Sequence, residues 1–220
     1  MIRDEILKLS GQSTGGGFNK RLSELIASGF VQAYTPYGYK KKLTFYRIID
    51  EYTMFYLDWI EPFRLKSEVT YDLDYWLNKS TSSSWISSAG HLFENTCYKH
   101  VPEIRKALKL QKISCDIGTW RYKAENENKP GTQIDLLFDR ADDVITLCEI
   151  KYSNKPFLID KAYGQELLRK INVLESYHKN RKTCFLALIT TFGLKKNLWS
   201  QELVSQEVTL SDLFAPREIS

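Results

Sequence analysis

The sequence predicts an α/β protein with a mixed β-sheet in its C-terminal half. Two apolar runs, Ile134–Phe138 and Val144–Cys148, flank the polar loop Asp139–Asp143, and this pattern predicts an antiparallel β-hairpin. The continuous apolar run Cys184–Ile189 is typical of a buried central strand. Residues Asp160–Tyr177 have helical apolar spacing. They therefore predict a crossover helix, after which the next strand runs parallel to the second hairpin strand.

The elements around this hairpin follow from local patterns. A helix is expected from Trp85 to near Pro102, a strand over Lys112–Tyr122 and an exposed polar loop over Ala124–Gly131. On the crossover helix, the spacing predicts one face toward the core and one toward solvent. The residues expected to face inward are Ala162, Leu167, Leu168, Ile171 and Leu174. The residues expected to face outward are Lys161, Arg169 and Lys170.

The first 50 residues predict a separate unit. Apolar residues at helical spacing occur in Ile2–Leu9 and Leu22–Ile26, and Gly29 follows as a C-cap. Strand-like segments then cover Phe30–Tyr34 and Leu43–Ile48. Helix, turn, helix, strand, turn, strand is the outline of a winged helix, in which the second helix can enter a DNA major groove.

Basic residues lie where such a unit would meet DNA. Lys20 and Arg21 fall at the N-terminal end of the second predicted helix, and Lys40, Lys41 and Lys42 fall in the turn between the strands. Contacts to phosphates need little more than such a patch. Two alternatives stay open, because winged helices also bind proteins and a lysine-rich turn can be a solvated loop.

An aromatic-rich segment follows, over residues 51–79. Phe55, Tyr56, Trp59 and Phe63 occur at helical spacing. Aromatic rings can serve as stacking platforms for bases, but a helical aromatic stripe more commonly forms a packing seam. We interpret residues 51–84 as a helical junction and residues 85–220 as a second domain.

Two carboxylates and a lysine carry the chemistry. In an antiparallel hairpin, residues of equal parity share a face, so Asp135, Glu149 and Lys151 should point the same way. Asp135 and Glu149 would then lie roughly 5–8 Å apart between Cβ atoms. Two carboxylates so close repel each other unless a cation lies between them, and a divalent metal suits oxygen ligands. With a neighbouring ammonium, this set can attack a phosphodiester. The alternative is a solvated Glu–Lys surface pair.

Asp135 with Glu149-Ile150-Lys151 resembles the core of the PD-(D/E)XK nuclease superfamily, whose members add an acid from a preceding helix; Glu94 matches it. The chain is also similar to the C-terminal region of a group of archaeal and bacterial AAA-type ATPases. The matching stretches are Tyr46–Asp50 with Phe55-Tyr56, Gly90–Glu94, Gln133–Leu137, Glu149–Ser153 and Thr190–Gly193.

The resemblance implies a winged helix followed by a restriction-endonuclease-like mixed sheet with flanking helices. It implies a DNA-binding hydrolase that uses Mg²⁺ or Mn²⁺. Asp135, Glu149 and the Ile150 carbonyl would hold the metal, Glu94 would hold metal-bound water, and Lys151 would act on the attacking water and the transition state. Lys155 and Gln165 would line the DNA path. The alternative is a catalytically silent DNA- or protein-binding module that regulates an ATPase.

Composition limits the remaining classes. The chain has 220 residues, a formal charge of +4 and a pI near 8.7, which permits nucleic-acid binding. It contains no Gly-x-x-x-x-Gly-Lys-[Ser/Thr] phosphate loop, so an AAA-type ATPase would be a partner in cis or in trans. The sequence has no apolar run of membrane-spanning length and no zinc-type cysteine spacing. We expect a cytoplasmic protein with DNA as partner and no membrane contact, and a homodimer stays open as an alternative.

Overall fold

The protein is described by a computed structural model that covers residues 1–12, 15–39, 43–66, 74–123, 131–177 and 182–215. It has a mixed α/β fold with one two-stranded and one five-stranded sheet, which confirms the predicted α/β class. The chain forms two compact units, Met1–Asn95 (the first unit) and Thr96–Ser220 (the second unit). The division falls within a helix, whereas the boundary expected from sequence was at residues 84–85.

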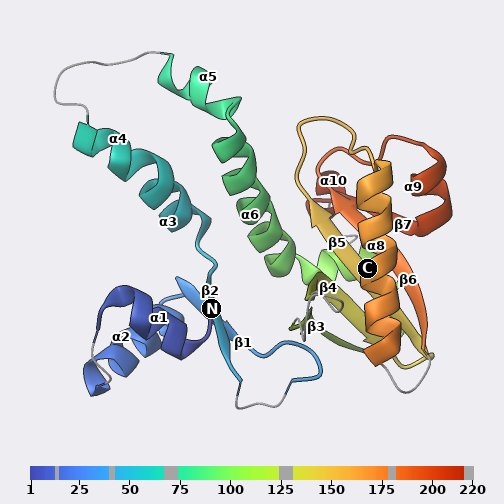
Figure 1. The fold of residues 1–220 in the computed structure, drawn as a ribbon, viewed down its shortest axis with the longest axis horizontal. Helices are drawn as coiled ribbons and strands as arrows, with labels where there is room; N and C mark the ends of the chain where they lie inside the picture. Colours follow the sequence, from blue (N-terminus) through green and yellow to red (C-terminus); the bar gives the residue numbers. More distant parts are fainter. Residues whose placement is uncertain (13–14, 40–42, 67–73, 124–130, 178–181, 216–220) are drawn as a thin grey trace. The chain divides into compact units, whose positions relative to one another are not determined.

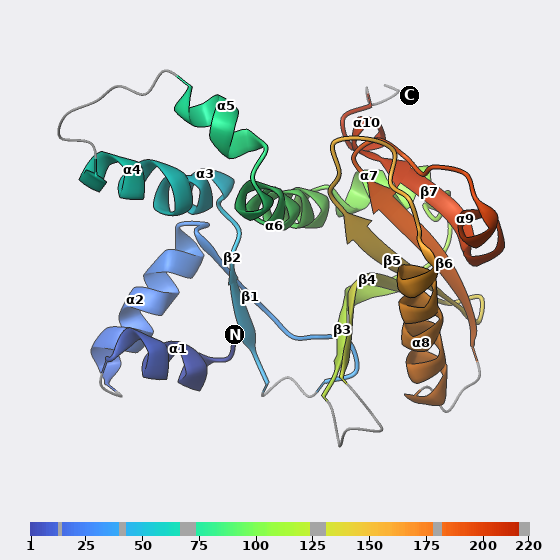
Figure 2. The same cartoon turned by 45° about the horizontal axis from the view of Figure 1, so that its top comes forward.

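The first unit begins with two helices and a β-ribbon (Figure 2). These elements are α1 (Arg3–Ser10), α2 (Gly16–Ala27), β1 (Val31–Tyr34) and β2 (Phe45–Ile48). The strands pair antiparallel, with Val31 opposite Ile48. Leu7, Phe18 and Leu22 form the small core between the helices. The predicted order of two helices and two strands is therefore present, and Lys40, Lys41 and Lys42 lie outside the described residues.

The aromatic-rich segment is helical and its rings pack together. It comprises α3 (Glu51–Phe55), the π-helical turn η1 (Tyr56–Ile60), α4 (Glu61–Lys66) and α5 (Tyr75–Ser80), and α6 (Ser83–Lys99) follows it. The ring of Trp59, which is only 6% exposed, meets Trp85 edge-on at 5.5 Å. Phe55 contacts Trp85 as well and stacks on Trp76. Phe55 and Trp59 of the predicted stripe therefore pack on other aromatic rings of the first unit, and the side chain of Phe63 lies outside the described residues.

The second unit is built on the five-stranded sheet, in the order β3-β4-β5-β6-β7 (Figure 1). Its elements are α7 (Val101–Ala107), β3 (Cys115–Tyr122), β4 (Thr132–Arg140), β5 (Val144–Lys151), α8 (Lys161–Tyr177), β6 (Thr183–Thr190), α9 (Leu198–Leu203), β7 (Val204–Thr209) and α10 (Leu210–Leu213). The β3–β4 and β4–β5 pairs are antiparallel, and the β5–β6 and β6–β7 pairs are parallel. The predicted hairpin and the predicted parallel strand after the crossover helix are both confirmed.

Strand β5 lies at the centre of this sheet and is buried on both faces. Every residue from Ile145 to Ile150 is buried, which is the pattern of a strand covered by helices on each side. In Figure 1, α8 lies across the sheet, and its residues Leu167 and Leu174 are fully buried. A polar or charged side chain on β5 is therefore removed from water and requires a partner.

The predicted phase of the crossover helix is wrong in part. Lys170, which we expected to face outward, is buried, whereas Ala162 and Leu168, which we expected to face inward, are exposed. Gly164 lies on the buried face, where a Cβ atom would come within 2.4 Å of the Trp199 ring of α9. The prediction missed this face because a glycine and a lysine are not recognised as inward positions by hydrophobicity.

We expect Gly164→Ala to destabilise the protein, because the added methyl group would overlap the indole of Trp199 and push α9 away from α8. Overpacking of this kind costs about 1–3 kcal/mol. The free energy of unfolding from urea denaturation, followed by circular dichroism, measures the effect.

The matched control is Gly90→Ala in α6, since a Cβ atom at this glycine would meet no neighbouring group within 4 Å. Alanine in a helix interior is favoured over glycine by about 0.5–1 kcal/mol. Equal stability changes at the two glycines would contradict close packing between α8 and α9.

Candidate functional site

Asp135 and Glu149 lie side by side at one end of the central hairpin. In the β4–β5 ladder, Leu136 pairs with Cys148, so Asp135 and Glu149 are the next residues on their strands. The Oδ2 atom of Asp135 accepts a hydrogen bond of 3.0 Å from the backbone N–H of Ile150. The two carboxyl groups are close enough that the charge of Asp135 raises the pKa of Glu149. The hairpin thus brings the two predicted carboxylates together.

The carboxylate of Glu149 is buried and only half satisfied. The residue is 1% exposed. Its Oε2 atom accepts a 2.7 Å hydrogen bond from Lys170 Nζ and a longer, 3.4 Å bond from the Tyr163 hydroxyl. Among the residues that the structure describes, Oε1 has no hydrogen-bond partner. A buried carboxylate oxygen without a partner is costly, and a cation bound beside it would remove that cost.

The pKa of Glu149 is raised to about 7. The largest cause is burial, because a buried carboxylate loses the water that stabilises its charge. The negative charge of Asp135 acts in the same direction, whereas Lys170 and Lys151 oppose the shift. Near neutral pH, the charge of this group therefore depends on the cations around it.

Lys151 completes the group at the end of β5. Its Nζ atom lies 5.1 Å from the centroid of the Tyr163 ring, over the ring face. Burial and the nearby charge of Glu149 raise the pKa of Tyr163, so its hydroxyl remains a hydrogen-bond donor. We call Asp135, Glu149, Lys151, Tyr163 and Lys170 the carboxylate cluster. All five belong to the second unit.

Sequence reasoning missed two members of the cluster, Tyr163 and Lys170. A signal was present, because Tyr163, Leu167, Lys170 and Leu174 follow the spacing i, i+4, i+7, i+11 of one helix face. Of these four residues, the sequence analysis counted only the two leucines as facing inward. A buried acid at Glu149 also required a cation from a covering helix, and α8 supplies it.

On the other face of the sheet, the C-terminal turn of α6 supports the same strands. The Tyr98 hydroxyl donates a 3.1 Å hydrogen bond to the backbone carbonyl of Asp135. Cys148 is fully buried beside Cys97, and burial raises the pKa of the Cys148 thiol. These contacts fix the backbone of both strands next to the carboxylate cluster, and the Cys148 thiol stays protonated.

The remaining predicted residues that the structure describes are half-buried or exposed on other parts of the chain. Glu94 is half-buried on α6 and belongs to the first unit. Lys155 and Gln165 are exposed in the second unit. Lys20 is exposed on α2 and lies 4.0 Å from Glu24.

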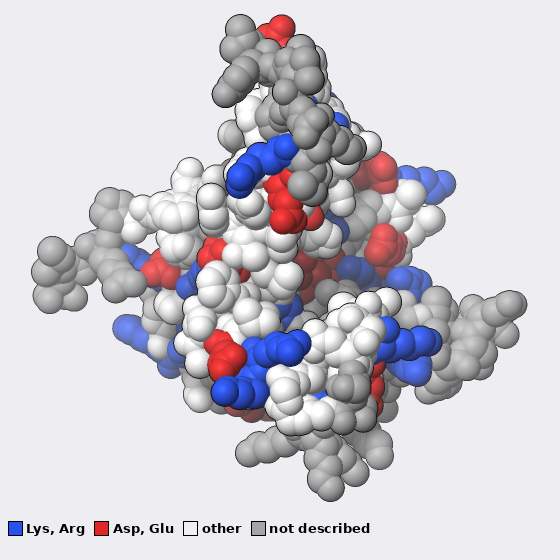
Figure 3. Space-filling model, turned by 90° about the vertical axis from the view of Figure 1, so that its left-hand side faces the viewer, with Lys and Arg blue, Asp and Glu red and all other residues white. Residues whose placement is uncertain are grey.

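Arg21, also exposed on α2, donates a 3.0 Å hydrogen bond to the side chain of Gln12. Figure 3 shows Lys and Arg interspersed with Asp and Glu on the face that it draws. That face therefore carries both signs of charge.

The cluster offers few protein ligands for a metal. Within the described ranges, no three His, Cys, Asp or Glu side chains form a group that could hold an ion. Magnesium does not require such a group, since it keeps several waters and binds through one or two carboxylates. The open Oε1 of Glu149, beside the charge of Asp135, fits this mode of binding.

Comparisons with known proteins found no match for this chain among family models, curated proteins or solved structures. The resemblance to nuclease-like domains therefore rests on the sequence motifs themselves. Among the helices that the structure describes, none has the length and apolar character needed to cross a membrane.

We expect Glu149 to make the stability of the metal-free protein fall as pH rises. Its pKa is about 7 in the folded protein and about 4.3 in an unfolded chain. The folded state therefore holds the proton more tightly, so this contribution is complete below the unfolded value and is lost as pH rises through the folded value. The difference corresponds to about 4 kcal/mol.

Urea unfolding in EDTA, at intervals between about pH 4 and pH 8, measures this for the wild type and Glu149→Gln. The free energy of unfolding of the wild type, relative to that of the variant, should decrease across the range. A difference that is constant or that increases with pH would show that Glu149 is ionised throughout.

Proposed function

We propose that the second unit is a metal-dependent phosphodiester hydrolase that acts on DNA. The observation that supports this most is the buried, half-satisfied carboxylate of Glu149, beside Asp135 and within reach of Lys151. A protein without a use for such a group would replace it with an apolar residue at little cost. The motif resemblance points to the same reaction class.

Each member of the cluster then has a role that follows from its contacts. Asp135 and Glu149 would hold Mg²⁺ or Mn²⁺, with the Ile150 carbonyl as the further ligand that the resemblance implies. The bound ion would supply Lewis-acid activation of the phosphate and a more acidic water. Lys170 holds Oε2 of Glu149, which favours the ionised carboxylate and leaves Oε1 open.

Lys151 would stabilise the negative charge that develops on the phosphate. Its ammonium is held near the Tyr163 ring, so it is oriented before the substrate arrives. A cation aimed at developing charge, with little reorganisation, is among the strongest catalytic contributions that a side chain makes. Lys155 and Gln165 would guide the DNA from the exposed surface of the same unit.

A second candidate function is a catalytically silent module that binds DNA or protein and regulates an AAA-type ATPase. The ion pair between Lys170 and Glu149 favours it, because a buried lysine can neutralise the acid without any metal. In that case the cluster is structural. The two functions differ in whether a divalent cation takes the open oxygen of Glu149.

We expect the purified chain to cleave DNA with Mg²⁺ or Mn²⁺ but not with Ca²⁺, because Ca²⁺ accepts longer and looser coordination. Asp135→Asn and Lys151→Met should each lower the rate by at least about 100-fold. Gel electrophoresis of linear, branched and single-stranded substrates measures cleavage.

Metal binding is tested separately by the rise in melting temperature that Mg²⁺ or Mn²⁺ produces. Asp135→Asn should abolish this rise, whereas Lys151→Met should keep it. Glu202→Gln, an exposed acid on α9, is the control and should change neither cleavage nor metal binding. A wild type that melts at the same temperature with and without the cations, and that cleaves nothing, would favour the silent module.

The first unit would contact DNA through α2. We expect the double substitution of Lys20 and Arg21 by alanine to weaken DNA binding and to flatten its salt dependence by up to about 0.9 log unit per lost phosphate contact. Substitution of Lys40, Lys41 and Lys42 by alanine tests the turn between the strands. Fluorescence anisotropy over a range of salt concentrations measures both. Lys8→Ala, exposed on α1, is the control, and identical slopes for all variants would assign this unit to protein contacts.

A further inference from the structure

The loop that follows β6 has a fixed backbone. Gly193 has a φ of +80° and its N–H donates a 2.9 Å hydrogen bond to the Thr190 hydroxyl. A Cβ atom at this glycine would lie 2.6 Å from the Glu207 carboxylate, which accepts a 3.1 Å bond from the N–H of Leu194. Only glycine combines this backbone conformation with this close approach.

A second loop, which follows β5, is bonded to the first one. The N–H of Phe157 donates to the carbonyl of Gly193, and the N–H of Lys195 donates to the carbonyl of Phe157, both at 2.8 Å. The N–H of Ser153 also donates to the Thr191 hydroxyl at 3.0 Å. The two loops therefore form one hydrogen-bonded platform at the carboxyl ends of β5 and β6.

Phe192 projects from this platform into solvent. It is 60% exposed, although the residues on both sides of it, Thr191 and Gly193, are buried. An exposed phenyl ring on a fixed backbone gains nothing for the fold. It does have a low cost of ordering when a flat partner stacks on it, because its backbone is already in place.

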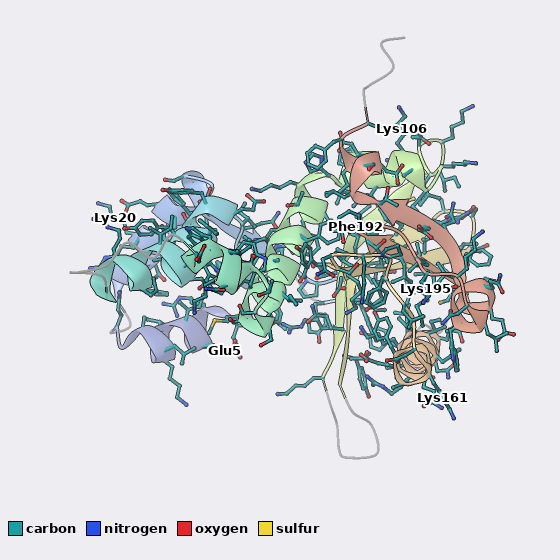
Figure 4. The ribbon with its side chains drawn as sticks, turned by 90° about the horizontal axis from the view of Figure 1, so that it is seen from above. Glu5, Lys20, Lys106, Lys161, Phe192 and Lys195 are labelled. Carbon is teal, nitrogen blue, oxygen red and sulfur yellow. The ribbon has the colours of Figure 1, made fainter. Side chains whose placement is uncertain are left out.

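The platform adjoins the carboxylate cluster. Lys151 pairs with Thr190 across the parallel β5–β6 ladder, so Phe192 comes two residues beyond the partner of a cluster residue. Exposed lysines lie on the segments next to the ring: Lys155 and Lys195 extend from the two bonded loops, and Lys161 begins α8. Figure 4 labels all three of Phe192, Lys195 and Lys161 in the second unit, with Lys195 drawn between Phe192 and Lys161.

We infer that the ring of Phe192 stacks on a nucleobase, and that the carboxylate cluster acts on unpaired DNA. This inference rests on the proposed function and adds the class of substrate. Aromatic side chains bind single strands by stacking on bases, while nearby cations track the phosphates. In a duplex the bases are already stacked on each other, so the ring of Phe192 has no base face to meet. A single strand, a flap or a frayed end offers one.

The test is DNA binding by the full chain in Ca²⁺, measured by fluorescence anisotropy with a labelled oligothymidylate of about 12 nucleotides and with a duplex of equal length. Phe192→Ala should weaken binding of the single strand by roughly tenfold and leave binding of the duplex unchanged. Phe192→Trp should restore binding, because indole stacks at least as well as phenyl.

The control is Phe185→Ala, since Phe185 is also an exposed aromatic of β6 (43% exposed) but lies five residues before the end of that strand, roughly 16 Å along the strand direction from Thr190. It should bind both probes as the wild type does. Loss of binding that is equal for the two probes, or no loss in Phe192→Ala, would overturn the inference.

The experiments distinguish failure of the proposed hydrolase function from failure of the inference about Phe192. Hydrolysis is not needed for the binding measurement, so a chain that cleaves nothing in Mg²⁺ contradicts the proposed function and still reports on Phe192. If the chain cleaves DNA equally well with alanine or phenylalanine at position 192, the result supports the proposed function and excludes base stacking on Phe192. A wild type that prefers the duplex also excludes it.

Discussion

The ion pair between Glu149 and Lys170 is the interaction on which the second unit depends. Transfer of a carboxylate into a protein interior costs several kcal/mol, even after relaxation. Strand β5 imposes that transfer because it is buried on both faces. Lys170 offsets it from 2.7 Å away, and to do so it must lie on the inner face of α8. The rotation of α8 about its own axis is therefore set by charge as well as by its leucines.

That rotation explains which parts of the fold were predictable from sequence. The hairpin and the strand β6 were predicted because their burial follows apolar patterns, and the pairing of Asp135 with Glu149 followed from residue parity alone. The inner face of α8 was not predicted, because two of its residues, Tyr163 and Lys170, are polar or amphipathic. Their inward position depends on Glu149 of strand β5. A pattern within α8 contains no information about that partner. Phe192 could not be found either, since an apolar residue in sequence predicts burial and this one is exposed.

In the candidate site, the two carboxylate oxygens of Glu149 have different surroundings. One oxygen of Glu149 is held by lysine, and the other is open. A catalytic centre and an inactive relative can share this arrangement, because the lysine stabilises the acid in both. Helix α8 thus stabilises the Glu149 carboxylate through Oε2 and leaves Oε1 without a hydrogen-bond partner among the described residues.

The parallel pairing of β5 with β6 has a consequence for the order of folding. The β4–β5 hairpin joins residues near in sequence, whereas the β5–β6 ladder joins residues about forty positions apart, across α8. Long-range pairings form late, because the entropy of closing the intervening chain must first be overcome. Helix α8, which covers Glu149 and removes it from water, also carries the ammonium of Lys170 that compensates for the loss. Burial and charge compensation of this carboxylate therefore cannot be separated, because the same element supplies both.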